Sequence, residues 1–305
     1  MRPVICIAGP TASGKSAYAL RVAAAMDGEI INADALQVYT DLHVLSARPT
    51  REEMGGIPHH LFGHIAGNVR YSTGAWLREV EPVILDCLAR SKTPILVGGT
   101  GLYFRALLIG MADIPAISDQ VSLDTAKFLE SEGIEALRQS AERLDPFATA
   151  RVLGHDPQRL QRIVNVAKGT GRALSTWQAE THPVVPTRFA RFCVLTPPRD
   201  RLYARINARY DEMLRAGGLK EAEAVFALNY DSSLPVMKAI GLRQLQRYFE
   251  GSGSLDEAVE DAKRESRRFA KRQMTWFRNQ PPAGQLLEHA NDQDAFLARV
   301  RGLSF

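Results

Sequence analysis

Short apolar runs alternate with helical patterns over the first hundred residues. The runs VICIAG, EIINAD and PILVGG begin at residues 4, 29 and 94. Between them, residues 15–26 and 73–91 repeat their apolar side chains at intervals of three and four. Buried strands separated by amphipathic helices are typical of a parallel α/β sheet with crossover helices. We therefore predict such a sheet for this part of the chain.

The pattern changes after residue 116. Residues 117–186 have a mainly helical pattern that several prolines divide into short helices, and the next strand-like run, RFCVLT, begins at residue 191. From residue 200 onward the pattern is helical almost to the end. The simplest organisation is an α/β core domain made of residues 1–116 and 187–305, interrupted by an all-helical insertion domain at 117–186. The C-terminal helices belong to the core domain.

Composition adds few constraints. The 305 residues are 45% hydrophobic and 24% charged, as in ordinary soluble proteins. The three cysteines, Cys6, Cys87 and Cys193, are far apart and form no pattern typical of disulfides or zinc sites. The apolar stretches are too short to span a membrane, and we expect no leader segment before the first strand. We expect a cytoplasmic, monomeric protein without a membrane partner.

The first predicted strand leads into a phosphate-binding motif. GPTASGKS matches G-x-x-x-x-G-K-[ST] and lies between a strand and a helix, the context that this motif requires. Backbone N–H groups can converge on a diphosphate there, Lys15 adds positive charge, and the Ser16 hydroxyl can bind Mg²⁺. A glycine turn capped by Ser13 is the alternative. The motif predicts a P-loop NTPase-like core and is typical of ATP or GTP binding, but it leaves open whose phosphates are bound. The predicted phosphate-binding residues are Gly9, Pro10, Thr11, Ala12, Ser13, Gly14, Lys15 and Ser16.

Two further candidates follow the other strands. Asp34 ends EIINAD, and it could serve as an acid near magnesium, as a general base or as the cap of an Asx turn. Thr100 follows PILVGG, either as a ligand contact or as the cap of a tight turn. Ligands of open parallel sheets bind at the carboxyl ends of the strands, which favours a functional role for Asp34.

Basic and histidine-rich segments suggest other contacts. Arg159 and Arg162 share one helical face and suit a diphosphate, although an exposed basic face is the common alternative. Adjacent histidines cannot easily face one ion, so we expect packing or turn roles rather than a metal site for His59, His60 and His64.

A basic block near the C-terminus predicts a polyanion partner. Residues 263–278 contain seven Lys or Arg and one acid, a local charge of +6 against +4 for the whole chain. Phe269, Gln273, Trp276 and Phe277 share one side of the predicted helix. Charge combined with aromatic side chains is typical of nucleic-acid binding. We expect Phe269 and Phe277 to pack on the core, and the charges to contact RNA.

Taken in order, these segments resemble one family, the tRNA dimethylallyltransferases, also called tRNA isopentenyltransferases. The resemblance rests on GPTASGKS, DALQVY with ARP, PHHL, GGTGLYFRAL, PQRLQR, AIGLRQ and AKRQMTWFR, which together span residues 9–278. It implies that the P-loop binds dimethylallyl diphosphate rather than ATP. It also implies transfer of the dimethylallyl group to N6 of the adenosine 3′-adjacent to the anticodon of tRNA (adenosine 37), giving N6-isopentenyladenosine and pyrophosphate.

The resemblance also implies roles for single residues. Asp34 would take the N6 proton, Thr100 would lie near the transfer centre, and Lys15 with Mg²⁺ would stabilise the departing pyrophosphate. Arg159 or Arg162, with Arg162 favoured, would add charge to the diphosphate or to the RNA backbone. The target adenosine would flip out of its stack. The implied tRNA-binding residues are Asp34, Ala35, Leu36, Gln37, Thr100, Ser122, Gln158, Arg159, Leu160, Gln161, Arg162, Lys238, Gly241, Arg243, Lys271, Arg272, Gln273, Trp276 and Arg278.

This chain departs from the family pattern at a few positions. Ala35 replaces a usual serine, Leu242 replaces an aromatic residue, and Ser122 stands where the family has an arginine. Three alternatives remain: a free-nucleotide prenyltransferase, a P-loop small-molecule kinase in which 196–209 would be a lid, and an RNA-binding protein without chemistry. The basic block favours tRNA over a free nucleotide.

Overall fold

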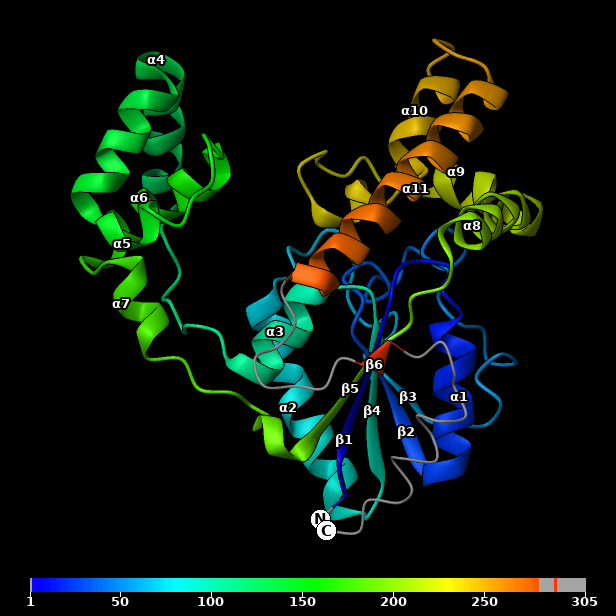
Figure 1. The fold of residues 1–305 in the computed structure, drawn as a ribbon. Helices are drawn as coiled ribbons and strands as arrows, with labels where there is room; N and C mark the ends of the chain where they lie inside the picture. Colours follow the sequence, from blue (N-terminus) through cyan, green and yellow to red (C-terminus); the bar gives the residue numbers. More distant parts are fainter. Residues whose placement is uncertain (1, 280–287, 290–305) are drawn as a thin grey trace. The chain divides into compact units, whose positions relative to one another are not determined.

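One parallel sheet forms the centre of the core. The computed structural model describes residues 2–279 and 288–289, and within these ranges the strand order is β3-β2-β4-β1-β5-β6 (Figure 1). Strands β1 (Val4–Ala8), β2 (Gly28–Asn32), β4 (Thr93–Gly98) and β5 (Ala190–Val194) confirm the four predicted runs. The two-residue strands β3 (His59–His60) and β6 (Glu288–His289) extend the sheet at its edges and were not predicted. Residues 280–287 and 290–305 of the predicted core domain lie outside the described residues.

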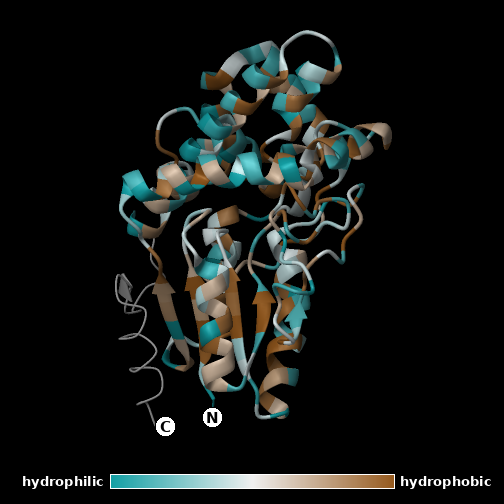
Figure 2. Cartoon of the chain, turned by 90° about the vertical axis from the view of Figure 1, so that its right-hand side faces the viewer, coloured by the Kyte–Doolittle hydropathy of each residue, from teal (hydrophilic) through white to brown (hydrophobic). Residues whose placement is uncertain are grey.

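Helices cover both faces of the sheet because alternate strand residues point in opposite directions. Ile5 and Ile7 of β1 pack with helix α1 (Lys15–Met26). Cys6 and Ala8 pack on the other face, against helices α2 (Thr73–Ala89) and α3 (Gly101–Ile109). The strands are mainly apolar (Figure 2), as expected for a sheet buried on both faces, although β2 also buries Glu29 and Asn32.

The contacts between residues divide the chain into two compact units. One comprises Met1–Ile109 with Val184–Phe305, and the other comprises Gly110–Pro183. The second unit contains helices α4 (Asp119–Leu144), α5 (Pro146–Thr149), α6 (Pro157–Thr170) and α7 (Leu174–Ala179), packed around their own apolar cluster. These limits lie near the predicted boundaries at 117 and 186. That the second unit is an independent insertion domain stays a prediction.

The last part of the described chain is helical, as predicted. A short 3₁₀ turn (Thr187–Phe189) precedes β5, and helix α8 (Arg199–Met213) continues through a π-helical turn, Leu214–Gly218, into α9 (Leu219–Ala227). A 3₁₀ turn (Pro235–Lys238), α10 (Leu242–Phe249) and the long α11 (Leu255–Asn279) follow. No helix within 2–279 is long and apolar enough to cross a membrane.

Candidate active site

One cavity of about 1170 Å³ lies at the carboxyl ends of the strands in the first unit. It brings together the phosphate loop, the turn after β2, the turn after β4 and the inner face of α11. Among the predicted site residues, those on its wall are Thr11, Ala12, Ser13, Gly14, Lys15, Ser16, Asp34, Ala35, Leu36, Gln37, Thr100, Lys238, Arg272, Gln273 and Trp276.

The phosphate loop is held in an unusual backbone conformation. Ala12 and Gly14 have φ angles of 60° and 89°, in the left-handed region that an L side chain rarely adopts. Gly9 has no room for a side chain, since a Cβ there would lie 2.8 Å from Ser13 Oγ. Helix α1 begins at Lys15 without a side-chain cap, so its first N–H groups remain available to an anion. Strain of this kind is typical of functional loops.

A group of three charged residues surrounds the cavity floor. Lys15 Nζ donates to the carbonyl of Pro10 at 3.2 Å, and burial lowers the pKa of Lys15 to about 8 while the Asp34 carboxylate acts in the opposite direction. Burial also lowers the pKa of Arg209 on α8, again opposed by Asp34. Sequence analysis missed Arg209. Arg205 and Arg209 lie four residues apart on one helical face, and this spacing is a sequence signal for two basic side chains at one site.

The turn that carries Asp34 is built on a buried asparagine. Asn32 Oδ1 accepts the N–H of Asp34 at 2.9 Å, and Asn32 Nδ2 donates to the carbonyls of Asp34 and Leu61, each at 3.0 Å. Asp34 Oδ1 accepts the N–H of Leu36 at 3.0 Å, so the Asx turn considered from the sequence is present. The carboxylate nevertheless lines the cavity, so capping and a chemical role are compatible.

Thr100 connects two strand ends. Its Oγ1 accepts the N–H of Ala35 at 3.0 Å, and its own N–H donates to the carbonyl of Ala33 at 3.2 Å. Its hydroxyl therefore holds the Asp34 turn against the β4 turn. The methyl of Ala35, where the family usually has serine, packs against the apolar cluster on the α2 side of the sheet.

Comparison with known proteins identifies the family. The model of the IPP transferase family matches residues 37–280, which is most of the chain, and that of the isopentenyl transferase family matches residues 2–61. This chain belongs to the IPP transferase family.

Relatives and solved structures agree with this assignment. Proteins named tRNA dimethylallyltransferase from Maricaulis maris and Hyphomonas neptunium are 49% and 46% identical to this IPP transferase, covering 92% of it and 91% and 90% of their own lengths. The full-length tRNA isopentenylpyrophosphate transferase from Bacillus halodurans superimposes with a TM-score of 0.70 at 30% identity, covering 99% of this chain and 95% of that one. A eukaryotic dimethylallyltransferase acting on tRNA has a TM-score of 0.80 at 27% identity, covering 91% of this chain and 70% of that one.

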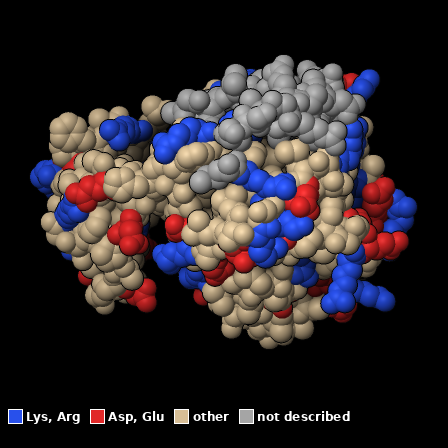
Figure 3. Space-filling view, turned by 90° about the horizontal axis from the view of Figure 1, so that it is seen from below, with Lys and Arg blue, Asp and Glu red and all other residues tan. Residues whose placement is uncertain are grey.

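The basic block of this IPP transferase is partly neutralised within the fold. Lys263 pairs with Asp211 at 2.7 Å, Arg264 pairs with Asp261, and Arg272 pairs with Glu265 at 2.8 Å. Elsewhere, on the face drawn in Figure 3, Lys and Arg are also interspersed with Asp and Glu. Arg272 is exposed, as are Lys271 and Arg278. A second cavity, of about 490 Å³, lies along helix α11. It is lined by Arg268, Lys271, Arg272, Thr275, Trp276 and Asn279.

Phe269 and Leu160 lie differently from our expectation, and Gln273 is turned into the protein. Phe277 is 1% exposed and packs in the core as predicted, but Phe269 is partly exposed on the main cavity wall, with the Arg272 guanidinium 5.7 Å from its ring centre. Leu160 is fully buried in the apolar cluster of the second unit, so its side chain does not reach RNA. Gln273 is 6% exposed and its amide is bonded within the protein, so its predicted contact with tRNA stays a prediction.

The other predicted contacts remain predictions. Gly241 is buried beside the Tyr210 hydroxyl, whereas Arg243 on α10 is exposed. Arg159 is exposed and pairs with Asp156 at 3.3 Å. Within the second unit, the remaining predicted positions lie at the start of α4 and along α6, namely Ser122, Gln158, Gln161 and Arg162.

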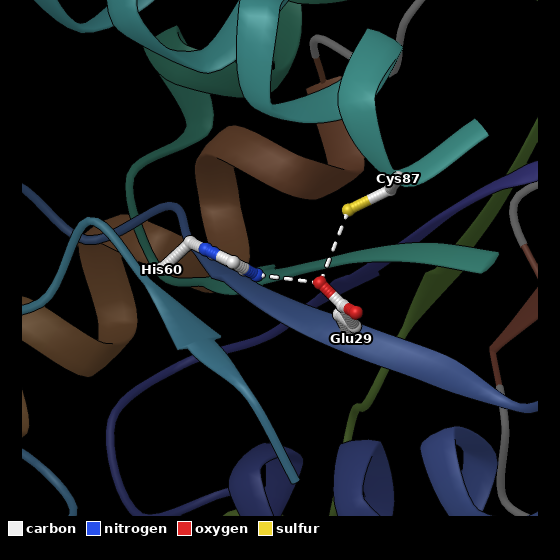
Figure 4. Close-up of side chains that lie close together, drawn as sticks. All are labelled: Glu29, His60 and Cys87. Atoms are coloured by element: carbon white, nitrogen blue, oxygen red, sulfur yellow. Dashed lines mark hydrogen bonds and ion pairs between the residues drawn. The ribbon is translucent and has the colours of Figure 1, made fainter. Parts of the chain in front are cut away.

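The histidine-rich segment contributes to packing, as expected. His60 Nε2 lies 2.7 Å from a carboxylate oxygen of Glu29, and Cys87 Sγ lies 3.5 Å from the same oxygen (Figure 4). These are metal-ligating residue types, but Arg90 donates to both carboxylate oxygens, at 2.5 and 2.8 Å. A cation would have to displace that guanidinium. We assign the cluster a structural role, because its hydrogen bonds connect edge strand β3 and the C-terminal end of α2 to β2.

Proposed function

We propose that this IPP transferase is a tRNA dimethylallyltransferase, which transfers the dimethylallyl group of dimethylallyl diphosphate to N6 of adenosine 37 in tRNA. One observation carries the proposal: a single cavity is lined by a phosphate loop, a carboxylate and a helix with exposed basic residues. Its volume, about 1170 Å³, has room for a nucleobase beside a five-carbon diphosphate. A tRNA substrate is also consistent with the cytoplasmic location that we expect.

The phosphate loop binds the diphosphate in this proposal. The free N–H groups at the start of α1, together with Lys15 and Arg209, offset the charge that grows on the leaving group. Ser16 is exposed on the cavity wall and fits Mg²⁺, which uses few protein ligands when phosphate oxygens supply the others. When bound, Mg²⁺ would screen the negative charge of the diphosphate.

Asp34 acts on the nucleophile. The bond between N6 and C1 of the dimethylallyl group forms as the bond from C1 to the diphosphate oxygen breaks, and pyrophosphate leaves with the electron pair. N6 then carries one proton too many, which the Asp34 carboxylate accepts. An exocyclic amine conjugated with a purine is a weak nucleophile, so its orientation matters as much as basicity. Thr100 and Asn32 hold the Asp34 turn for this purpose.

The RNA lies along α11 in this proposal. Lys271 and Arg278 are exposed and form no ion pair with a described residue, so they are available to phosphate groups. Trp276 lines both cavities and is placed to stack on a base. Adenosine 37 must leave its stack to reach Asp34, so we expect base flipping.

The test is transfer from labelled dimethylallyl diphosphate, with Mg²⁺, onto unmodified tRNA, with AMP in a parallel reaction. Label in tRNA alone supports the proposal. Label in AMP alone would identify a free-nucleotide enzyme, and ATP consumption without label would indicate a kinase. The variant Asp34→Asn should retain tRNA binding and lose transfer by about 10²–10⁴-fold, the usual contribution of a general base.

A further inference from the structure

Gln273 joins the two glycine turns of the site. Its Oε1 accepts the N–H of Thr11 in the phosphate loop at 2.9 Å, and its Nε2 donates to the carbonyl of Gly99, after β4, at 3.0 Å. The contacts span 262 and 174 residues of sequence. The fit is close, because a Cβ on Gly99 would lie 2.1 Å from Gln273 Nε2.

The amide is matched to these two partners. One side chain must accept from an N–H on one turn and donate to a carbonyl on the other. Glutamate would keep the acceptor but place an oxygen against the Gly99 carbonyl, and methionine would leave both backbone groups unpaired. The N–H of Thr11 precedes the residues whose N–H groups face an anion, so Gln273 fixes the loop without competing with a diphosphate.

Gln273 also lies on the helix proposed to bind RNA. Helix α11 runs unbroken from Leu255 to Asn279 and carries Lys271 and Arg272 on its exposed side. One turn after Gln273, the ring of Trp276 covers the backbone of Gly101, where a Cβ would lie 2.2 Å from a ring carbon. A shift of α11 would therefore displace both turns through Gln273, and it would also displace the turn after β4 through Trp276.

We propose that Gln273 is a positioning residue that couples tRNA binding on α11 to the phosphate loop. Through this side chain, tRNA sets the position of the loop relative to Thr100, and a bound diphosphate in turn favours the tRNA-binding position of α11. The inference rests on the proposed function for the identity of the two ligands.

The experiment measures binding without turnover. The dissociation constant of inorganic pyrophosphate with Mg²⁺ is determined with and without saturating tRNA, for the wild type, Gln273→Met and Gln273→Glu. The matched control is Gln246→Glu, the same change at an exposed position of α10. Tenfold or greater coupling is expected in the wild type and in the control. In both Gln273 variants the ratio should fall toward one, and kcat should fall more than the KM for tRNA rises.

A second variant keeps the test independent of folding. Gly99→Ala disturbs the same contact from the other turn, so the double variant with Gln273→Met should be no more impaired than either single one. Equal coupling in the wild type and Gln273→Met, or no coupling in the wild type, would overturn the inference. Failure of the proposed function is a separate outcome, since it would appear as absent transfer by the wild type.

Discussion

The Asp34 turn allows a quantitative prediction from Asn32. Asn32 is completely buried, and its side chain makes three hydrogen bonds, two of them to the backbone of Asp34. Asn32→Ala removes the amide and leaves the N–H and C=O of Asp34 and the C=O of Leu61 without these partners. We predict a less stable protein whose general base is also displaced.

The magnitude follows from the bonds lost. At about 1 kcal/mol net for each neutral hydrogen bond, three bonds correspond to about 3 kcal/mol of unfolding free energy. Displacement of Asp34 by a fraction of an ångström should lower kcat by about 10–100-fold, because a misplaced base loses alignment with N6. The diphosphate is held by a different loop, so its binding should change little.

Urea unfolding and single-turnover transfer measure the two effects separately. Asn68→Ala is the matched control, because Asn68 is exposed and makes no hydrogen bond to a described side chain. Asn32→Ser, which retains one hydroxyl, should lie between alanine and the wild type. An Asn32→Ala protein with unchanged kcat would refute the view that Asn32 positions Asp34, whatever its stability.

Three other predictions follow from the charges. Above pH 8, the affinity for the diphosphate should fall as the pH rises, because the pKa of Lys15 is lowered to about 8 and only its protonated form attracts the anion. Calorimetry in buffers of different ionisation enthalpy should therefore show proton uptake on binding. Glu221→Gln should cost about 2 kcal/mol of stability by urea unfolding, because its carboxylate accepts the three N–H groups of residues 43–45, at 2.7–2.8 Å. Glu29→Gln should lower the free energy of unfolding by its full amount above pH 4.5, and this loss should shrink as the pH falls toward 2. Hydrogen bonds from Arg90, opposed by burial, lower the pKa of Glu29 from 4.5 to about 2, so the wild-type carboxylate loses its charge, and its advantage over glutamine, in that range.

Each of these has a control. Lys15→Arg should remove the pH dependence above 8, and a slope that survives would exclude Lys15 as its source. Glu223→Gln, on the same helix but exposed, should leave stability unchanged, and equal effects at 223 and 221 would contradict the role of Glu221. Glu81→Gln serves the same purpose for Glu29. A Glu29→Gln deficit that grows as the pH falls would show that the sign is wrong.

Local pattern was sufficient for the main elements. Mainly apolar runs identified β1, β2, β4 and β5, because strands buried on both faces carry few polar residues. The strands β3 and β6 could not be found this way, since two residues carry no periodicity. Their place is decided by pairing with a neighbour, as when His59 and His60 pair with β2.

Part of the candidate site could likewise be predicted from local sequence, and part of it could not. The sequence alone determined the phosphate loop, because glycine, lysine and serine at fixed spacing form a local structure, and it indicated Asp34 from its place after a strand. Only the tertiary structure decided that Arg209 joins Lys15 and Asp34 and that the Gln273 amide bonds to the turns at Thr11 and Gly99. Helical periodicity shows which residues share a side, but which side meets the core depends on contacts between segments more than 150 residues apart.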